Sequence, residues 1–159
     1  MPSVNTRVRA PRAVLDTNIL ARLLLTPRGF SARLLGLLEA GRFVLITSEF
    51  ILAEVADVLA RPHVQRYGPY PPREIAEAMD ALRAIATVVP GRYEVFVVAG
   101  DPDDNPVLAC ALDGNADFVV SDDRKHLLPL KHYRGVQIVS APLFVRFFRD
   151  VRNVPRRSN

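Results

Sequence analysis

A short apolar run that ends on a carboxylate dominates the N-terminal part of this chain. Residues 13–15 (Ala-Val-Leu) show no polar alternation, which is typical of a strand buried on both faces of a sheet. Asp16 ends the run, and Thr17 is a candidate N-cap for a helix over residues 18–25. In parallel α/β sheets, ligands bind at the carboxyl ends of the strands. Asp16 is therefore a candidate site residue, and its alternative role is that of a turn or cap residue.

Short apolar runs alternate with amphipathic stretches along the whole chain, an order typical of a layered α/β fold. The expected strands lie at residues 13–15, 43–46, 88–89, 118–121 and 136–139, with a further extended piece at 95–98. The expected helices lie at residues 18–25, 31–40, 49–60, 74–87, 106–112 and 142–149. We therefore predict a three-layer α/β/α domain around a mostly parallel sheet of about five strands.

Length and composition fit one globular domain. The 159 residues are 49% hydrophobic and 24% charged, and a chain of this length buries a sizeable core. No apolar run approaches the roughly 20 residues of a membrane span, and the polar, basic start lacks the apolar core of a signal peptide. We expect a cytoplasmic protein with a flexible segment over residues 1–11, one domain over 12–149 and a flexible basic tail over 150–159.

The charge balance and the single cysteine narrow the chemistry. A net charge of +4 favours an anionic partner, although a solvated basic tail accounts for part of the excess. Cys110 alone excludes an internal disulfide and a multi-cysteine zinc site. Because Cys110 lies in the apolar run 107–112, we interpret it as a core residue and not as a nucleophile.

A second acidic candidate lies on the helix expected after Ser48. Helical spacing places Glu54 beside Val58, at the border of the apolar face, whereas Asp57 points farther toward solvent. Glu54 is therefore the acidic residue of this helix that is best placed to face inward. The alternative is a rim glutamate whose stem covers the core while its head stays in water.

Two further acidic clusters precede a helix or follow a strand. In the stretch 101–106 (Asp-Pro-Asp-Asp-Asn-Pro), Asp104 projects onto the apolar face of the following helix, whereas Asp103 projects away from it. Asp122 and Asp123 follow the strand expected at 118–121, and the spacing does not choose between them. The alternative for each cluster is a set of turn and N-cap residues.

Acidic residues gathered from four separate segments would repel one another strongly. At a separation of about 4 Å and an effective dielectric constant of about 20, each like-charged pair costs about 4 kcal/mol. Protons or divalent cations would relieve that repulsion, and oxygen ligands suit Mg²⁺ or Mn²⁺ better than zinc. The histidines show no metal-ligand spacing, so we interpret His63, His126 and His132 as surface or structural residues.

Five segments together make the chain resemble the PIN domain family over nearly all of residues 12–145. Within that family it is most similar to the toxin components of toxin–antitoxin systems, related to the VapC-type toxins. The matching segments are VLDTNIL (14–20), TSEFILAEVADVLARP (47–62), DPDDNPVLACAL (101–112), ADFVVSDDRKHLLPL (116–130) and GVQIVSAPLF (135–144). The resemblance implies a PIN-like, Rossmann-like fold that is shared with 5′-nucleases.

The resemblance also assigns site residues by position. The acidic, metal-binding and catalytic positions of the family fall on Asp16, Glu54, Asp104 and Asp123. Asp123 is preferred because the family pattern there resembles Ser-Gly-Asp, with Asp122 standing where glycine is usual. Supporting positions fall on Asn18, beside the first aspartate, and on Ser48, which heads the glutamate helix.

The resemblance implies a Mg²⁺- or Mn²⁺-dependent ribonuclease that hydrolyses RNA phosphodiester bonds, is held in check by a cognate antitoxin and forms a homodimer. Arg22 and Arg124 are candidates for positioning phosphates, although both also suit a solvated surface. The first alternative is a PIN-like module that binds RNA or protein without cutting. A second is a phospho-aspartate receiver domain, which would require a lysine directly after a late strand, where this chain has Arg124 before Lys125.

Overall fold

The computed structural model describes residues 9–26, 28–66, 68, 70–97 and 105–152, with side chains as far as residue 149. The strands are β1 (Arg12–Leu15), β2 (Val44–Ser48), β3 (Thr87–Val89), β4 (Phe118–Val120), β5 (His132–Tyr133) and β6 (Val136–Val139). The helices are α1 (Thr17–Leu25), α2 (Phe30–Glu39), α3 (Glu49–Ala60), α4 (Pro62–Gln65), α5 (Pro72–Ile85), α6 (Asn105–Asp113) and α7 (Ala141–Arg152), with a 3₁₀ turn η2 (Leu128–Leu130).

The strands form one sheet in the order β3-β2-β1-β4-β6-β5, and every pairing is parallel except that of β5 with β6. Strand β1 is central, because Val14 is in register with Ile46 of β2 and with Val119 of β4. Ala13, Val14 and Leu15 are fully buried. The predicted α/β fold with a mostly parallel sheet is therefore confirmed, and the strand run before Asp16 forms its centre.

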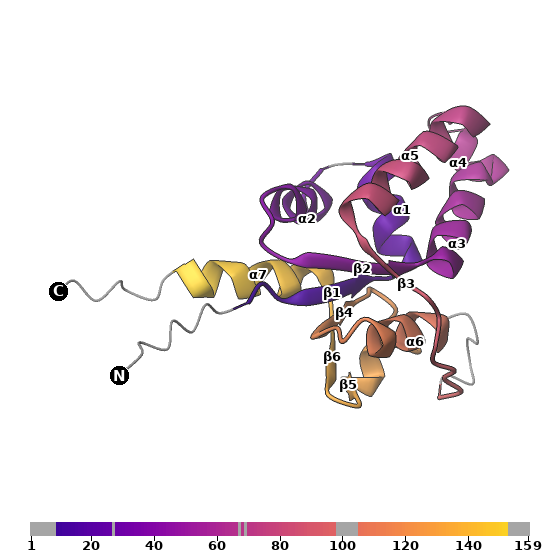
Figure 1. Cartoon of the computed structure of the whole chain (residues 1–159). Helices are drawn as coiled ribbons and strands as arrows, with labels where there is room; N and C mark the ends of the chain where they lie inside the picture. The colour runs from indigo at the N-terminus through magenta and orange to yellow at the C-terminus, as the bar shows by residue number, and fades with distance from the viewer. Residues whose placement is uncertain (1–8, 27, 67, 69, 98–104, 153–159) are drawn as a thin grey trace, which may run out of the picture.

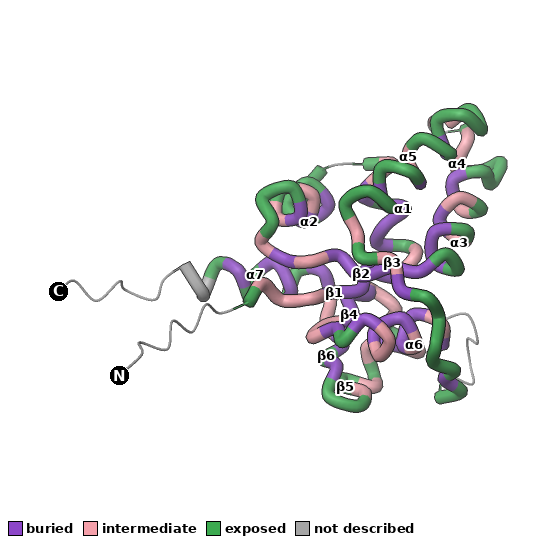
Figure 2. Tube along the Cα trace, in the orientation of Figure 1, coloured by how far each residue is buried: buried purple, intermediate pink, exposed green. Residues whose placement is uncertain are grey.

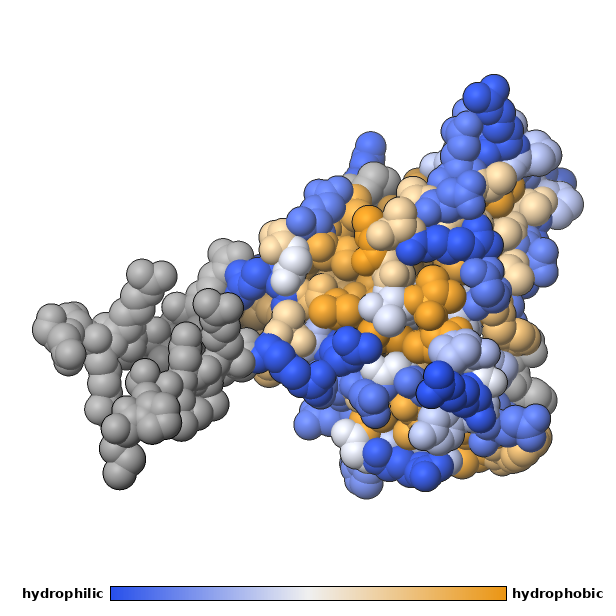
Figure 3. Space-filling view, viewed as in Figure 1, coloured by the Kyte–Doolittle hydropathy of each residue, from blue (hydrophilic) through white to orange (hydrophobic). Residues whose placement is uncertain are grey.

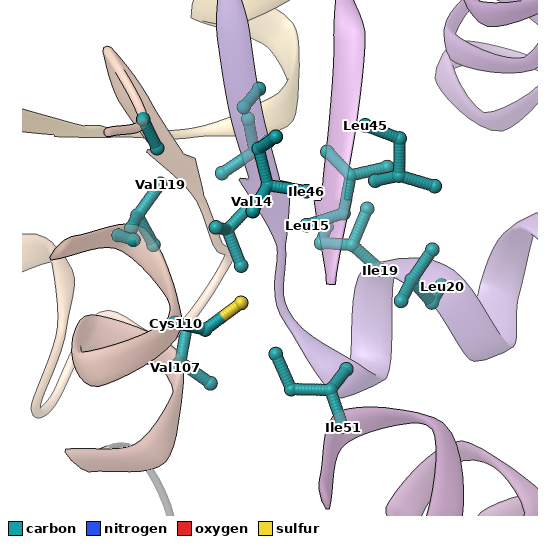
Figure 4. Close-up of a cluster of buried hydrophobic side chains, with 14 of the residues drawn as sticks. Val14, Leu15, Ile19, Leu20, Leu45, Ile46, Ile51, Val107, Cys110 and Val119 are labelled. Atoms are coloured by element: carbon teal, nitrogen blue, oxygen red, sulfur yellow. The ribbon is translucent and has the colours of Figure 1, made fainter. Parts of the chain in front are cut away.

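Helices cover both faces of the sheet. Helices α1, α2, α3 and α5 lie on one side, and α6 lies on the other (Figure 1). Side chains alternate between the two layers, as the pleat requires: Val14 and Ile46 point toward Cys110 of α6, whereas Leu15 and Leu45 point toward α1 (Figure 4). The buried positions therefore run along the central strands and along the inner faces of the helices (Figure 2).

Helix α7 is held by an aromatic cluster. Phe144 is 1% exposed and makes edge-on ring contacts with Phe43, Phe118 and Phe148, at centroid distances of 5.2, 5.5 and 5.2 Å. Because Phe43 precedes β2 and Phe118 begins its strand, these contacts fasten α7 to the sheet. The helix also packs against α2.

Several boundaries differ from the sequence-based prediction. Strand β5 was not anticipated, because two residues are too short for an alternating pattern. The extended piece at 95–98 is not a strand over its described residues 95–97, and the stretch after Arg61 forms the short helix α4. Helix α7 continues to Arg152, beyond the predicted end at 149.

Three further findings bear on the predictions about composition. Cys110 is 3% exposed, and burial raises the pKa of its thiol to about 12, which agrees with a core role. Within the described ranges, no helix combines the length and the apolar composition needed to cross a bilayer. The expected terminal segments lie largely outside those ranges, since residues 1–8 and 153–159 are not described.

Candidate functional site

The carboxyl ends of β1 and β4 bring two predicted acidic segments to one edge of the sheet. The two strands are neighbours, and the Asp16 amide donates a hydrogen bond of 3.0 Å to the carbonyl oxygen of Val120. Asp16 directly follows β1, and Asp122 and Asp123 follow β4 with only Ser121 between. Because β1 and β4 are parallel, Asp16 lies at the same edge of the sheet as Asp122 and Asp123, although about a hundred residues separate them in the sequence.

Asp16, and not Thr17, is the N-cap of α1. Its Oδ1 accepts a hydrogen bond of 2.8 Å from the Ile19 amide, while its Oδ2 accepts one from the Ser121 hydroxyl. The residue is only 6% exposed. Burial raises the pKa of Asp16 and the negative charges of Asp122 and Asp123 act in the same direction, whereas the hydrogen bonds from Ser121 and Ile19 oppose them. The chain thus holds a carboxylate where ionisation is disfavoured.

Glu54 reaches the same place from α3, which packs against α1. Its Oε2 accepts a hydrogen bond of 2.9 Å from the Thr17 hydroxyl, and the side chain is partly buried. This contact holds the carboxylate of α3 against the start of α1, one residue beyond Asp16. The predicted inward orientation of Glu54 agrees with this arrangement.

Asp123 is fixed by the turn that follows β4. Its Oδ1 accepts hydrogen bonds from the amides of Lys125 and His126 at 2.9 and 3.1 Å, and its Oδ2 lies 3.2 Å from Nδ1 of His126. The Asp123 amide donates to the Ser121 hydroxyl at 3.0 Å. Because the same hydroxyl donates to Asp16, the fully buried Ser121 links the two aspartates.

Asp122 has a different environment. Its Oδ2 accepts a hydrogen bond of 2.8 Å from the Arg22 guanidinium, and both side chains are partly exposed. The extra negative charge at this position is therefore compensated by an arginine of α1. Arg22, a candidate for positioning phosphates that also suits a solvated surface, lines the same cleft as the acidic residues.

These residues line a cleft of about 900 Å³ between α1, α3 and the segment after β4. Five carboxylates and two arginines line it: Asp16, Glu54, Asp57, Asp122, Asp123, Arg22 and Arg61. Val107 of α6 also lines the cleft. Asp104, the remaining predicted ligand, precedes α6 in the sequence and lies outside the described residues. Among those that are described, no three His, Cys, Asp or Glu side chains converge closely enough to hold one ion.

The two supporting residues lie in different places. Asn18 is exposed in the first turn of α1 and lines the acidic cleft. Ser48 is the buried N-cap of α3, where its hydroxyl accepts a hydrogen bond of 3.3 Å from the Ile51 amide. Ser48 is not among the described residues that line the acidic cleft. It acts on the site only through α3, because it caps the helix that carries Glu54.

Sequence reasoning missed three residues of this site. Thr17 was interpreted only as a cap, Ser121 as the end of a strand and His126 as a surface or structural residue. Each contacts a predicted acidic residue: Thr17 contacts Glu54, Ser121 contacts Asp16, and His126 contacts Asp123. Their positions in the sequence could have indicated Thr17 and Ser121, because Thr17 directly follows Asp16 and Ser121 directly precedes Asp122.

Comparison with known proteins agrees with this architecture. Residues 12–125 match the PIN domain family. The chain is 27% identical over 120 residues to an uncharacterized protein of Methanocaldococcus jannaschii, a match that covers 76% of this chain and 75% of that protein. Its fold resembles a crystal structure of VapBC2 from Rickettsia felis bound to a DNA fragment from their promoter. The TM-score is 0.57 at 14% identity, over 81% of this chain and 98% of the other.

Proposed function

Because this chain belongs to the PIN domain family, we propose that it is a metal-dependent endoribonuclease that hydrolyses RNA phosphodiester bonds. The observation that carries the proposal is the buried Asp16. Its carboxylate lies among other acids, at the carboxyl edge of a parallel sheet, with a raised pKa. The hydrogen bonds from Ile19 and Ser121 offset part of the cost of burying this charge, and a cation or a proton would offset the rest.

The donor set of the cleft suits a hard divalent cation. The acidic side chains that line the cleft offer carboxylate oxygens as metal ligands, and Mg²⁺ and Mn²⁺ prefer such oxygen ligands. We propose that Asp16, Glu54, Asp104 and Asp123 hold the metal. When bound, the ion would lower the pKa of a water molecule and neutralise charge on the phosphoryl oxygens.

The residues around the acids would position them. Ser121 and the Ile19 amide each hold one oxygen of Asp16, which fixes the plane of its carboxylate. Thr17 holds one oxygen of Glu54, and His126 holds one oxygen of Asp123. Asn18, exposed at the cleft, would orient a carboxylate or a water molecule. Asp122 is the less suitable fourth ligand, since Arg22 already compensates its charge.

We further propose that the protein is the toxin of a toxin–antitoxin pair and acts in the cytoplasm as a homodimer. The support is the resemblance to VapC-type toxins and the similar fold of VapBC2, which was crystallised bound to a DNA fragment from their promoter. Its partners would be cellular RNA and a cognate antitoxin protein.

Cleavage of RNA by the purified protein tests the proposal. Single-stranded and structured RNA would be incubated with Mg²⁺ or Mn²⁺, or with a chelator, using wild type, Asp16→Asn and Glu54→Gln. We expect metal-dependent cleavage by the wild type only. Cleavage that survives both substitutions would reveal a contaminating nuclease and remove the assignment.

Thermal melting gives an independent test of metal binding. An ion that binds only the folded form adds about 2.7 kcal/mol at a hundred times its dissociation constant. For a domain of this size, that corresponds to a rise of roughly 5–11 °C in Tm. An unchanged Tm in tens of millimolar Mg²⁺ or Mn²⁺ would count against the metal site. A metal-dependent rise without cleavage would favour the non-catalytic PIN-like module.

A further inference from the structure

The charges around the acidic cleft are segregated. The Arg22–Asp122 pair lines the acidic cleft, and on its other side the charged side chains are mostly arginines. The pair also lines a second hollow of about 350 Å³, situated where α2 and α7 begin. Among the described residues, Asp122 is the only acidic one that lines this hollow, and Arg124 and the exposed Phe30 also lie on it. The two cavities are therefore neighbours that share an ion pair as their common wall.

A third hollow, of about 300 Å³, lies along the contact between α2 and α7. Its charged lining residues are Arg33, Arg42 and Arg149, and no acidic residue of the described chain lines it. Arg33 connects the two hollows, because its guanidinium carbon lies 5.7 Å from the ring centroid of Phe30. Helices α2 and α7 are adjacent in the fold (Figure 1). We call the surface that these two hollows and the Arg33–Phe30 contact span the basic seam, and define it by Arg22, Arg124, Phe30, Arg33, Arg42 and Arg149.

The arginines of the basic seam are available to a ligand. Within the described part of the chain, Arg33, Arg42, Arg124 and Arg149 form no ion pairs; Arg42 is partly buried and the other three are exposed. Phe30 exposes 45% of its surface at the start of α2. A run of uncompensated guanidinium groups attracts a polyanion. An exposed aromatic ring among them offers a surface on which a base can stack.

We propose that the basic seam binds the single-stranded RNA that flanks the scissile bond. This inference rests on the proposed nuclease function, because only that function puts a phosphodiester into the acidic cleft. The strand would leave the cleft past Arg22, stack a base on Phe30 and place phosphates against Arg33 and Arg149. A duplex would keep its bases paired and would not use Phe30. Arg22 is then a positioning residue that Asp122 holds at the point where the strand enters the seam.

Binding measured in chelator tests the seam without requiring catalysis. The probe is a fluorescein-labelled oligouridylate of about 12 nucleotides, a length within the range that single-strand-binding modules cover. Affinity is measured across a salt series for wild type and for Arg33→Gln/Arg149→Gln. Each phosphate contact with a single strand contributes about 0.7 to the slope of log K against log salt. We expect the double variant to bind several-fold more weakly, with a slope about 1.4 smaller in magnitude.

A matched variant controls for net charge. Arg66→Gln/Arg73→Gln also removes two positive charges, but at the hydrophilic tip formed by α4 and α5 (Figure 3). All four arginines are exposed. The Arg73–Glu77 pair that the control breaks is an exposed helix pair that contributes little to stability, so both variants should melt close to the wild type. We expect the control to bind with the wild-type slope. Equal slopes for the seam variant and the control, or no binding of the probe at low salt, would overturn the proposal.

Phe30 tests the stacking contact separately. Phe30→Leu retains an apolar side chain but removes the ring, and should weaken oligouridylate binding roughly five-fold or more. Phe30→Tyr keeps an aromatic ring and should bind the oligouridylate like the wild type. Duplex RNA should bind Phe30→Leu and Phe30→Tyr with equal affinity. Identical single-strand binding by Phe30→Leu and wild type would refute this contact. Metal-dependent cleavage by a protein whose seam variants bind like the wild type would refute the seam and leave the nuclease function standing. Seam-dependent binding without cleavage would refute the nuclease function and leave only single-strand binding by the seam.

Discussion

Replacing Ser121 with alanine tests whether one buried hydroxyl holds the site together. The hydroxyl donates to the Asp16 carboxylate and accepts from the Asp123 amide, and Ser121 is 0% exposed. A hydrogen bond to a charged group contributes about 1.5–3 kcal/mol and a neutral one about 0.5–1.5 kcal/mol. We therefore expect Ser121→Ala to lose roughly 2–4 kcal/mol of unfolding free energy, or roughly 4–16 °C in Tm.

The loss should depend on pH with a definite sign. Burial raises the pKa of Asp16 in the folded state, while the hydrogen bond from Ser121 lowers it by favouring the ionised form. The raised pKa stabilises the fold at pH values below the unfolded pKa of the carboxyl, and that contribution is lost as pH rises through the folded pKa. Without the Ser121 hydroxyl, the pKa of Asp16 in the folded state rises further, and the ionised form of Asp16 becomes less favourable. The deficit of Ser121→Ala should therefore be small in acid and should grow as Asp16 ionises.

Urea unfolding followed by circular dichroism, in chelator and over a series of pH values, measures this difference. Ser48→Ala is the matched control, because Ser48 is also a buried serine but its hydroxyl accepts from the Ile51 amide at the start of α3. Loss of that cap should cost about 1 kcal/mol at every pH. A Ser121→Ala deficit that is independent of pH and equal to the control would refute the link between Ser121 and Asp16.

Three other substitutions probe the site and the core. Asp16→Asn removes a buried charge, so in chelator at pH 7 the variant should melt at a higher temperature than the wild type. The difference in Tm should vanish in acid, where Asp16 of the wild type is protonated. Equal Tm values of variant and wild type at both pH values would contradict the raised pKa of Asp16. Thr17→Val deletes the hydroxyl that holds Glu54 and should slow metal-dependent cleavage, while Thr17→Ser should preserve it. Gly114→Ala would place a Cβ 2.3 Å from Cγ2 of the buried Ile46 and should cost about 1–3 kcal/mol in thermal melts. Gly36→Ala, which meets nothing within 4 Å in α2, should instead stabilise the protein by about 1 kcal/mol.

The sequence by itself determined the features that depend on local pattern. The unbroken apolar run 13–15 marked the central strand, because a strand buried on both faces tolerates no polar alternation. Helical periodicity placed Glu54 at the inner border of α3 for a similar reason, since the apolar face of a helix follows its 3.6-residue repeat. The family resemblance added the choice of acidic positions, of which Asp104 remains a prediction outside the described residues.

Tertiary structure decided the contacts that join distant parts of the chain. Ser121 and Asp16 are 105 positions apart, Arg22 and Asp122 are 100 apart, and Thr17 and Glu54 are 37 apart. No periodicity reports such a pair, because each depends on the register of neighbouring strands and on how helices pack across them. The basic seam has the same origin: α2 and α7 lie about a hundred residues apart in sequence, and only their packing gathers Arg33, Arg42 and Arg149 around one hollow.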